Sequence, residues 1–196
     1  MAGWLIALAA RALPARLWGE ETERAPLLPA LTLAPLLTAM AASLLPAPLA
    51  PVGALLGWVL LLASLIDLRH FALPDALTLP LIPAGLGVVF LTDRTALADH
   101  VIGAFAGYAV FAAIAALYRR FRGREGLGMG DAKLLAASGA WVGWAELPWV
   151  VLLAACAALL TALLGRRWQA DRMIAFGPFL ALGFWLVWLG LTFVGI

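Results

Sequence analysis

Long apolar runs alternate with short polar interruptions along the whole chain. An α-helix needs roughly 20 residues to cross the hydrocarbon core of a bilayer, and about 17 is near the lower limit. Apolar runs near that length predict membrane-spanning helices over residues 27–45, 51–66, 77–92, 100–118 and 174–194. The pattern therefore predicts an all-α fold, a multi-pass transmembrane helical bundle.

A further, longer apolar stretch covers residues 134–165 and is interrupted by Glu146 and Pro148. By itself the pattern allows one long helix or two short ones. Its flanks are both basic, with Arg119, Arg120, Arg122, Arg124 and Lys133 before it and Arg166, Arg167 and Arg172 after it. Because basic residues gather on the cytoplasmic side, both flanks should be cytoplasmic. We therefore expect two short helices joined by an outer turn near residues 146–148.

These elements add up to about seven spans, with the N-terminus inside and the C-terminus outside. Of the 13 lysine and arginine residues, only Arg94 then lies on the outer side, which is a strong orientation signal. Residues 1–24 are expected to form a cytoplasmic or interfacial amphipathic segment. Residues 25–196 are expected to form the transmembrane domain.

Glycines in two of the predicted spans have expected structural roles. Gly103 and Gly107 form a GxxxG pattern in an apolar span, which predicts close packing against another helix. In the last span, Gly177 and Pro178 are expected to kink or break the helix.

Composition narrows the class of protein further. Hydrophobic residues make up 65% of the chain and charged residues 12%, with a mean hydropathy of +1.01. A soluble domain is roughly 45–50% apolar and about 25% charged, so a soluble enzyme, a disordered chain and a nucleic-acid-binding module are excluded. The net charge of +2 is explained by basic residues beside the helices. The single cysteine, Cys156, excludes an internal disulfide and a CxxC metal site.

Candidate chemistry lies at two aspartates on the inner edge of the predicted spans. Asp67 ends the run GWVLLLASLI and precedes LRHFALPD, and Asp131 ends the glycine-rich stretch GLGMGD. Ionisable groups at membrane depth are costly and mark function. Two facing carboxylates could share a proton and supply a general base and a general acid, as in aspartic proteases. Gly128 and Gly130 give the chain freedom for unusual backbone angles and for close approach of a substrate backbone.

Other interpretations of the same residues remain open. The two aspartates could be ordinary helix caps at the membrane interface. A transporter or proton-conducting protein would also use paired aspartates and broken helices, but it predicts carboxylates near the midplane and an internal repeat, and neither is found. A non-catalytic assembly protein would not need the intact pair.

Three segments in order resemble the bacterial type IV prepilin peptidases, which are GxGD-type membrane aspartic proteases. These segments are SLIDLRHFALPDALTLPL, GREGLGMGDAKLLAASGAWVGW and IAFGPFLALG. The resemblance implies that Asp67 and Asp131 are the catalytic pair. It implies an endopeptidase of the inner membrane that removes a short basic leader from prepilins or pseudopilins at the cytoplasmic face. The leader of such substrates ends in glycine and is followed by an apolar helix.

The resemblance also assigns supporting roles around the pair, to Gly128, Gly130, Lys133, Pro74 and Asp75. Asp75 is expected to cap the next helix or to support the active site. Lys133 is expected to be an anchor on the inner side or an ammonium that favours ionised Asp131. His70 is a loop histidine or a proton shuttle.

Larger members of that family carry an N-terminal domain with two CxxC pairs and also N-methylate the new N-terminus with S-adenosylmethionine. This sequence has no CxxC, so we expect a short form with peptidase activity alone. No cofactor and no metal are predicted. The expected partners are prepilin or pseudopilin substrates and membrane lipid, with no nucleic acid, and the oligomeric state is left open.

Overall fold

The computed structural model describes residues 5–6, 9, 27–122, 128–164 and 175–194. Over this part of the chain it contains seven α-helices, a single 3₁₀ turn and no strand. The helices are α2 (Leu27–Leu44), α3 (Ala50–His70), α4 (Asp75–Thr92), α5 (Leu97–Arg122), α6 (Met129–Val142), α7 (Leu147–Leu164) and α8 (Gly177–Val194), and the turn η1 covers Arg94–Ala96. The predicted all-α helical bundle is confirmed. The amphipathic segment expected over residues 1–24 lies almost wholly outside the described residues.

Within the described residues, four helical segments are long and apolar enough to cross a membrane: Ala50–His70, Asp75–Thr92, Arg94–Phe121 and Leu147–Leu164. The apolar parts of α2 and α8 are shorter, at Thr32–Leu44 and Gly177–Phe193. Helix α6 has 14 residues, which at 1.5 Å per residue makes it shorter than the roughly 30 Å hydrocarbon core. These lengths support a membrane helical bundle in which some elements are short.

The stretch over residues 134–165 does form two helices, as the basic flanks predicted. Helix α6 ends at Gly143, whose φ of +80° lies in the left-handed region that favours glycine. The turn continues through Glu146, whose carbonyl accepts the backbone N–H groups of Trp149 and Val150 at the start of α7. The break therefore has two local causes, the glycine conformation and the polar turn before Pro148.

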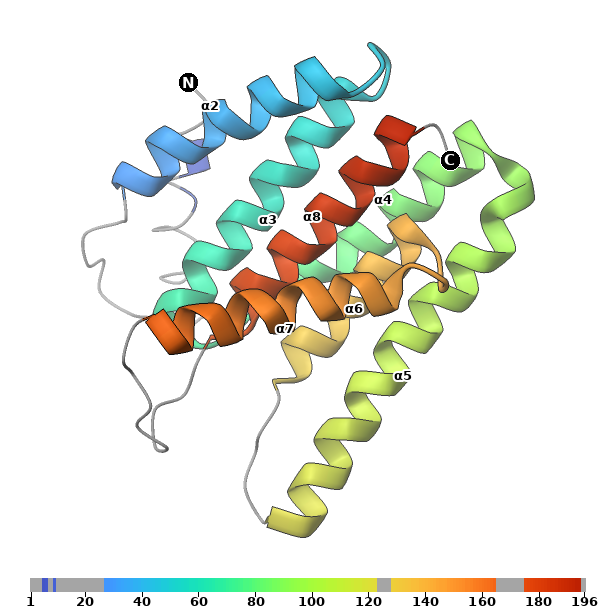
Figure 1. Ribbon diagram of the computed structural model, residues 1–196. Coiled ribbons are helices and arrows are strands. Elements are labelled where there is room, and N and C mark those ends of the chain that lie inside the picture. Colours follow the sequence, from blue (N-terminus) through green and yellow to red (C-terminus); the bar gives the residue numbers. More distant parts are fainter. Residues whose placement is uncertain (1–4, 7–8, 10–26, 123–127, 165–174, 195–196) are drawn as a thin grey trace.

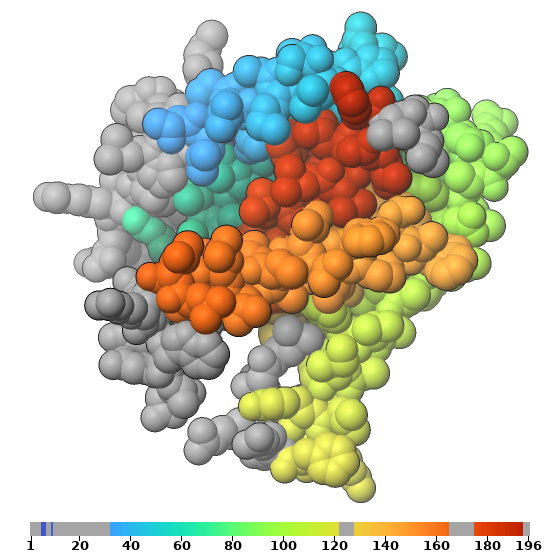
Figure 2. Space-filling model, in the orientation of Figure 1, coloured from blue at the N-terminus to red at the C-terminus, as the bar shows by residue number. Residues whose placement is uncertain are grey.

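Helices α6 and α8 lie at the centre of the bundle. Helix α6 packs against α4, α5 and α8, while α8 packs against α3, α6 and α7. Figure 1 shows α3 and α8 running beside each other, with α7 crossing in front of α6. The start of α8 thus lies against the last turn of α3. In Figure 2 the C-terminal end of α5 projects beyond the rest of the molecule.

Close packing of α5 on α6 depends on glycines from both helices. A Cβ added at Gly103 would lie 2.6 Å from the carbonyl oxygen of Gly139, and one added at Gly107 would lie 2.5 Å from that of Leu135. Membrane helices without a hydrophobic driving force associate through such small-residue contacts. The expected role of the GxxxG pattern is confirmed.

Gly139→Leu should therefore separate α5 from α6. A side chain there meets the Gly103 backbone, which cannot move as a side chain can, and overpacking costs about 1–3 kcal/mol or more. We expect a clearly lower thermal midpoint in detergent, followed by circular dichroism. Gly87→Leu is the matched control, because a Cβ at Gly87 meets nothing within 4 Å. Equal midpoints for the two variants would contradict this packing.

Candidate active site

Asp67 lies in the last turn of α3, and its side chain is buried at 5% exposure. Its Oδ2 accepts a hydrogen bond of 3.0 Å from the backbone N–H of Gly177, the first residue of α8. The first N–H groups of a helix have no partner within the helix. The N-terminus also carries a partial positive charge that favours an anion. The start of α8 therefore orients the Asp67 carboxylate.

Asp131 lies in the first turn of α6 and is also buried, at 8% exposure. Its backbone N–H donates to the Gly128 carbonyl at 3.1 Å, which begins the helix just after the glycine-rich loop. Asp67 and Asp131 are 64 positions apart in the numbering. The turn that follows Asp67 nevertheless packs, through Leu73, against Gly130 next to Asp131.

Leu73 links the two segments that carry this pair. Helix α3 ends at Phe71, whose left-handed φ of 50° turns the chain while its N–H donates to the Asp67 carbonyl. Leu73 follows in this turn and is buried at 7% exposure. Its side chain lies against Gly177, and its backbone and Cβ lie against Gly130. It therefore fills the space between the start of α6 and the start of α8.

The glycines of the GxGD element have different roles from those that the sequence suggested. Gly128 has φ of −69° and ψ of 138°, which any residue can adopt, and Gly143 alone among the described glycines has a positive φ. The expected unusual backbone angles at Gly128 and Gly130 are therefore wrong. A Cβ at Gly130 would instead lie 2.8 Å from the Leu73 Cβ. The packing of Leu73 leaves no room for a side chain at position 130.

Lys133 and Asp75 form a salt bridge, with Nζ 2.6 Å from Oδ1. The bridge joins the start of α4 to the first turns of α6. Lys133 follows Asp131 by two residues, and Asp75 follows Asp67 by eight. Their side chains are 24% and 57% exposed, so such a pair adds about 0.2–1 kcal/mol of stability. Of the two roles expected for Lys133, an anchor on the inner side or an ammonium beside Asp131, neither included this ion pair with Asp75.

The remaining residues of the first resembling segment also have defined places. The cap of α4 is Pro74, without a side-chain hydrogen bond, so the expected capping role of Asp75 is wrong and Asp75 is the first helical residue. Pro74 is buried, and its carbonyl accepts the N–H groups of Leu77 and Thr78. His70 is the last residue of α3 rather than a loop residue.

The role of Gly177 was not apparent from the sequence. Gly177 and Pro178 were expected to kink or break the last span, whereas they begin α8. A proline in the first turn of a helix loses no intrahelical hydrogen bond. A Cβ at Gly177 would lie 2.6 Å from the Asp67 Oδ2. The only signal in the sequence was the Phe-Gly-Pro triplet within the third resembling segment.

Chemically, the arrangement offers two buried carboxylates at the ends of two helices, one held by a helix N-terminus. Among the described residues, no three His, Cys, Asp or Glu side chains are placed to hold a metal ion. Carboxylate pairs of this kind can activate a water molecule and protonate a carbonyl oxygen, which is the chemistry of peptide hydrolysis.

Comparison with known proteins gives a consistent match. A family model described as the type IV leader peptidase family matches residues 54–163. A prepilin leader peptidase/N-methyltransferase of Aeromonas hydrophila is 41% identical over 174 residues, 83% of this chain and 59% of the relative. One of Burkholderia pseudomallei (strain 1026b) is 48% identical over 127 residues, 63% of this chain and 41% of the relative. The chain thus spans about half the length of these curated relatives. No solved structure matches it.

Proposed function

The chain belongs to the type IV leader peptidase family, and on that premise we propose that it is a membrane aspartic endopeptidase with Asp67 and Asp131 as its catalytic pair. The observation that carries the proposal is the burial of both carboxylates on segments that pack together through Leu73, with Asp67 held by the start of α8. The transporter alternative is not favoured, because both aspartates lie at helix ends and the matching relatives are named as peptidases.

In the proposed reaction, one carboxylate is ionised and the other is protonated. The ionised group takes a proton from water as the water oxygen attacks the carbonyl carbon of the scissile peptide bond. The protonated group donates its proton to the carbonyl oxygen. When the tetrahedral intermediate collapses, the C–N bond breaks, and the aspartate that took the proton from water gives it to the leaving nitrogen. The other aspartate takes back a proton from a hydroxyl of the intermediate, so both carboxyl groups return to their starting states. The products are a free carboxyl end and a new amino end, and no covalent enzyme intermediate forms.

The proposed substrates are prepilins or pseudopilins. Both relatives are named as prepilin leader peptidases, and the resemblance of the motifs implies a basic leader ending in glycine before an apolar helix. We propose that the cut falls just after this glycine, on the cytoplasmic side of the inner membrane. The names of the relatives also include N-methyltransferase, but peptidase activity alone stays our prediction for this chain.

The cytoplasmic orientation rests on the basic residues. With α6 and α7 crossing separately, the C-terminus should lie on the outer side. An alkaline phosphatase reporter fused after Ile196 should therefore be active in the periplasm. The same reporter fused after Arg122, at the end of α5, should be inactive. An inactive C-terminal fusion would contradict this topology. It would indicate that α6 and α7 together cross the membrane once, so that the start of α6 and the end of α7 lie on opposite sides.

A purified-protein assay tests the proposed activity. Synthetic peptides that contain a basic leader, a glycine and an apolar helix are incubated with the protein in detergent, and the products are mapped by mass spectrometry. We expect one cut, directly after the glycine, and no cut when a bulky residue replaces that glycine. Cleavage inside the apolar segment, or no cleavage of any such peptide, would contradict the proposal.

A further inference from the structure

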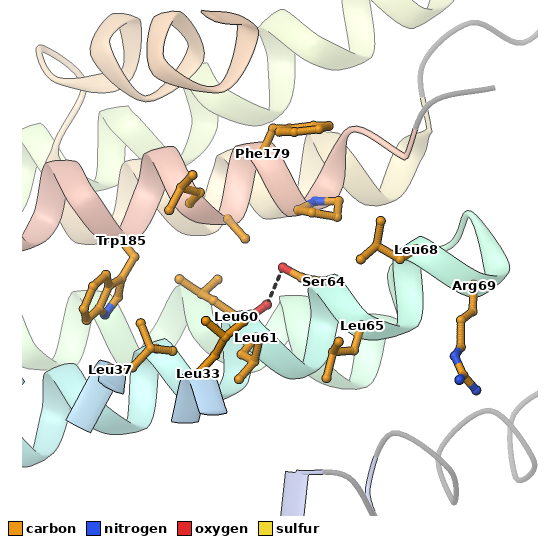
Figure 3. A pocket seen from close by; sticks show the side chains of 14 residues that line it. Leu33, Leu37, Leu60, Leu61, Ser64, Leu65, Leu68, Arg69, Phe179 and Trp185 are labelled. Carbon is orange, nitrogen blue, oxygen red and sulfur yellow. Dashed lines mark hydrogen bonds between the residues drawn. The ribbon is translucent and has the colours of Figure 1, made fainter. Parts of the chain in front are cut away.

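An apolar groove of about 460 Å³ lies between α2, α3 and α8. Figure 3 shows Ser64 and Leu68 of α3 pointing toward α8, while Trp185 of α8 points toward Leu37 of α2. Ser64 donates its hydroxyl to the Leu60 carbonyl of its own helix at 2.7 Å. The middle of the groove therefore presents an apolar surface although it contains a serine.

The groove ends near the candidate active site along both α3 and α8, although Asp67 and Gly177 do not line it. Its lining includes Leu68 and Arg69, which directly follow Asp67, and Pro178 and Phe179, which directly follow Gly177. Because Gly177 donates to Asp67, the two helices that form these walls meet at the candidate catalytic carboxylate, one residue beyond the lining on each helix.

The length of the groove fits a helical ligand. Along α3 the lining runs from Gly57 to Arg69, which at 1.5 Å per residue is about 18 Å, or some three turns. Along α8 it runs from Trp185 back to Pro178. Both walls therefore run lengthwise away from Asp67, as an elongated helix packed against them requires.

Small residues form part of the groove wall. Gly57, Ser64 and Ala181 contribute to the lining, and small side chains allow the backbone of a second membrane helix to approach closely. The indole of Trp185 is held by a hydrogen bond of 3.2 Å to the Gly53 carbonyl. A lipid acyl chain is the alternative occupant of such a groove. Small wall residues favour a helix over an acyl chain, because they allow the close backbone approach that occurs between packed helices.

We propose that this groove binds the apolar helix of the substrate, with the scissile bond just beyond the end of that helix at Asp67 and Asp131. This inference rests on the proposed function and adds to it the surface that selects the substrate. It makes α2, α3 and α8 the docking site, and it predicts that the apolar helix contributes binding energy while the leader contributes the bond to be cut.

Ser64→Trp tests the proposal because it fills the groove at its middle. Ser43→Trp is the matched control, since Ser43 lies on α2 outside the groove and its hydroxyl also donates to its own helix, at the Met40 carbonyl. For a leader–helix peptide we expect KM to rise at least tenfold in Ser64→Trp and to stay within twofold in Ser43→Trp, with kcat little changed. The smaller Ser64→Leu should give an intermediate KM if Ser64→Trp fails to fold.

Photo-crosslinking gives a second measurement that does not need cleavage. An Asp131→Asn protein is incubated with a leader–helix peptide that carries a photoreactive residue two turns after the glycine. We expect crosslinks to residues 33–37, 57–69 or 178–185. Crosslinks confined to other helices, together with an unchanged KM in Ser64→Trp, would overturn the groove assignment while the wild-type protein still cleaves. Failure of the wild-type protein to cleave any peptide would instead count against the proposed function.

Discussion

Asp131→Asn and Asp67→Asn should each abolish cleavage of leader peptides while leaving the fold intact. Asparagine has nearly the shape of aspartate, but it can neither accept a proton from water nor donate one as an acid. Positioned proton transfer contributes about 10²–10⁴-fold to a rate, so kcat should fall by at least that factor. Both side chains lie at helix ends, where the helices can persist without the charge.

The measurement is the initial rate for a leader–helix peptide with purified protein, and helical content and elution volume serve as controls for the fold. The double variant should be no less active than either single variant, because the two residues act as one unit. A single variant that keeps a tenth or more of the wild-type rate would contradict a catalytic role for that aspartate.

Gly177→Ala should have the second largest effect. The new Cβ would lie 2.6 Å from the Asp67 Oδ2 and 3.0 Å from its Cγ. These atoms belong to a side chain that can turn away, so the fold should survive. The carboxylate would then lose the hydrogen bond from the start of α8. Because a misplacement of about 1 Å at a reacting group can cost about 100-fold, we expect kcat to fall by that order.

Gly190→Ala is the matched control for this variant. It lies on the same helix, and a Cβ at Gly190 meets nothing within 4 Å. It should retain wild-type kcat and KM, whereas Gly177→Ala should lose kcat with little change in KM. If both variants keep full activity, the contact between Asp67 and the start of α8 has no catalytic importance.

Much of the fold followed from local pattern. Apolar runs located the helices, and the basic residues on both sides of 134–165 decided between one helix and two. Boundaries were less accurate where polar residues belong to helices. Helix α3 continues to His70 and α6 begins at Met129, so both aspartates lie inside helices, although the apolar runs ended or began near them.

Contacts between distant segments could not be predicted from local pattern. Asp67 and Gly177 are 110 positions apart, and Lys133 and Asp75 are 58 apart. Nothing near Gly177 indicates that its N–H meets a carboxylate, and nothing near Gly130 indicates that Leu73 packs on it. The sequence therefore identified the residue types of the candidate site, while their partners depend on how α3, α6 and α8 pack.

The most direct test of the account is the binding of a leader–helix peptide whose scissile amide is replaced by a hydroxyl-bearing, tetrahedral isostere. Analogues of a transition state bind about 10²–10⁸-fold more tightly than substrates, and binding can be measured in variants that no longer cleave. If both aspartates contact the reacting carbonyl, the wild-type protein and Gly190→Ala should bind this analogue tightly. Asp67→Asn and Asp131→Asn should each lose at least 100-fold in affinity. Equal affinity in the wild-type protein and in either aspartate variant would contradict the claim that the two carboxylates form the catalytic pair.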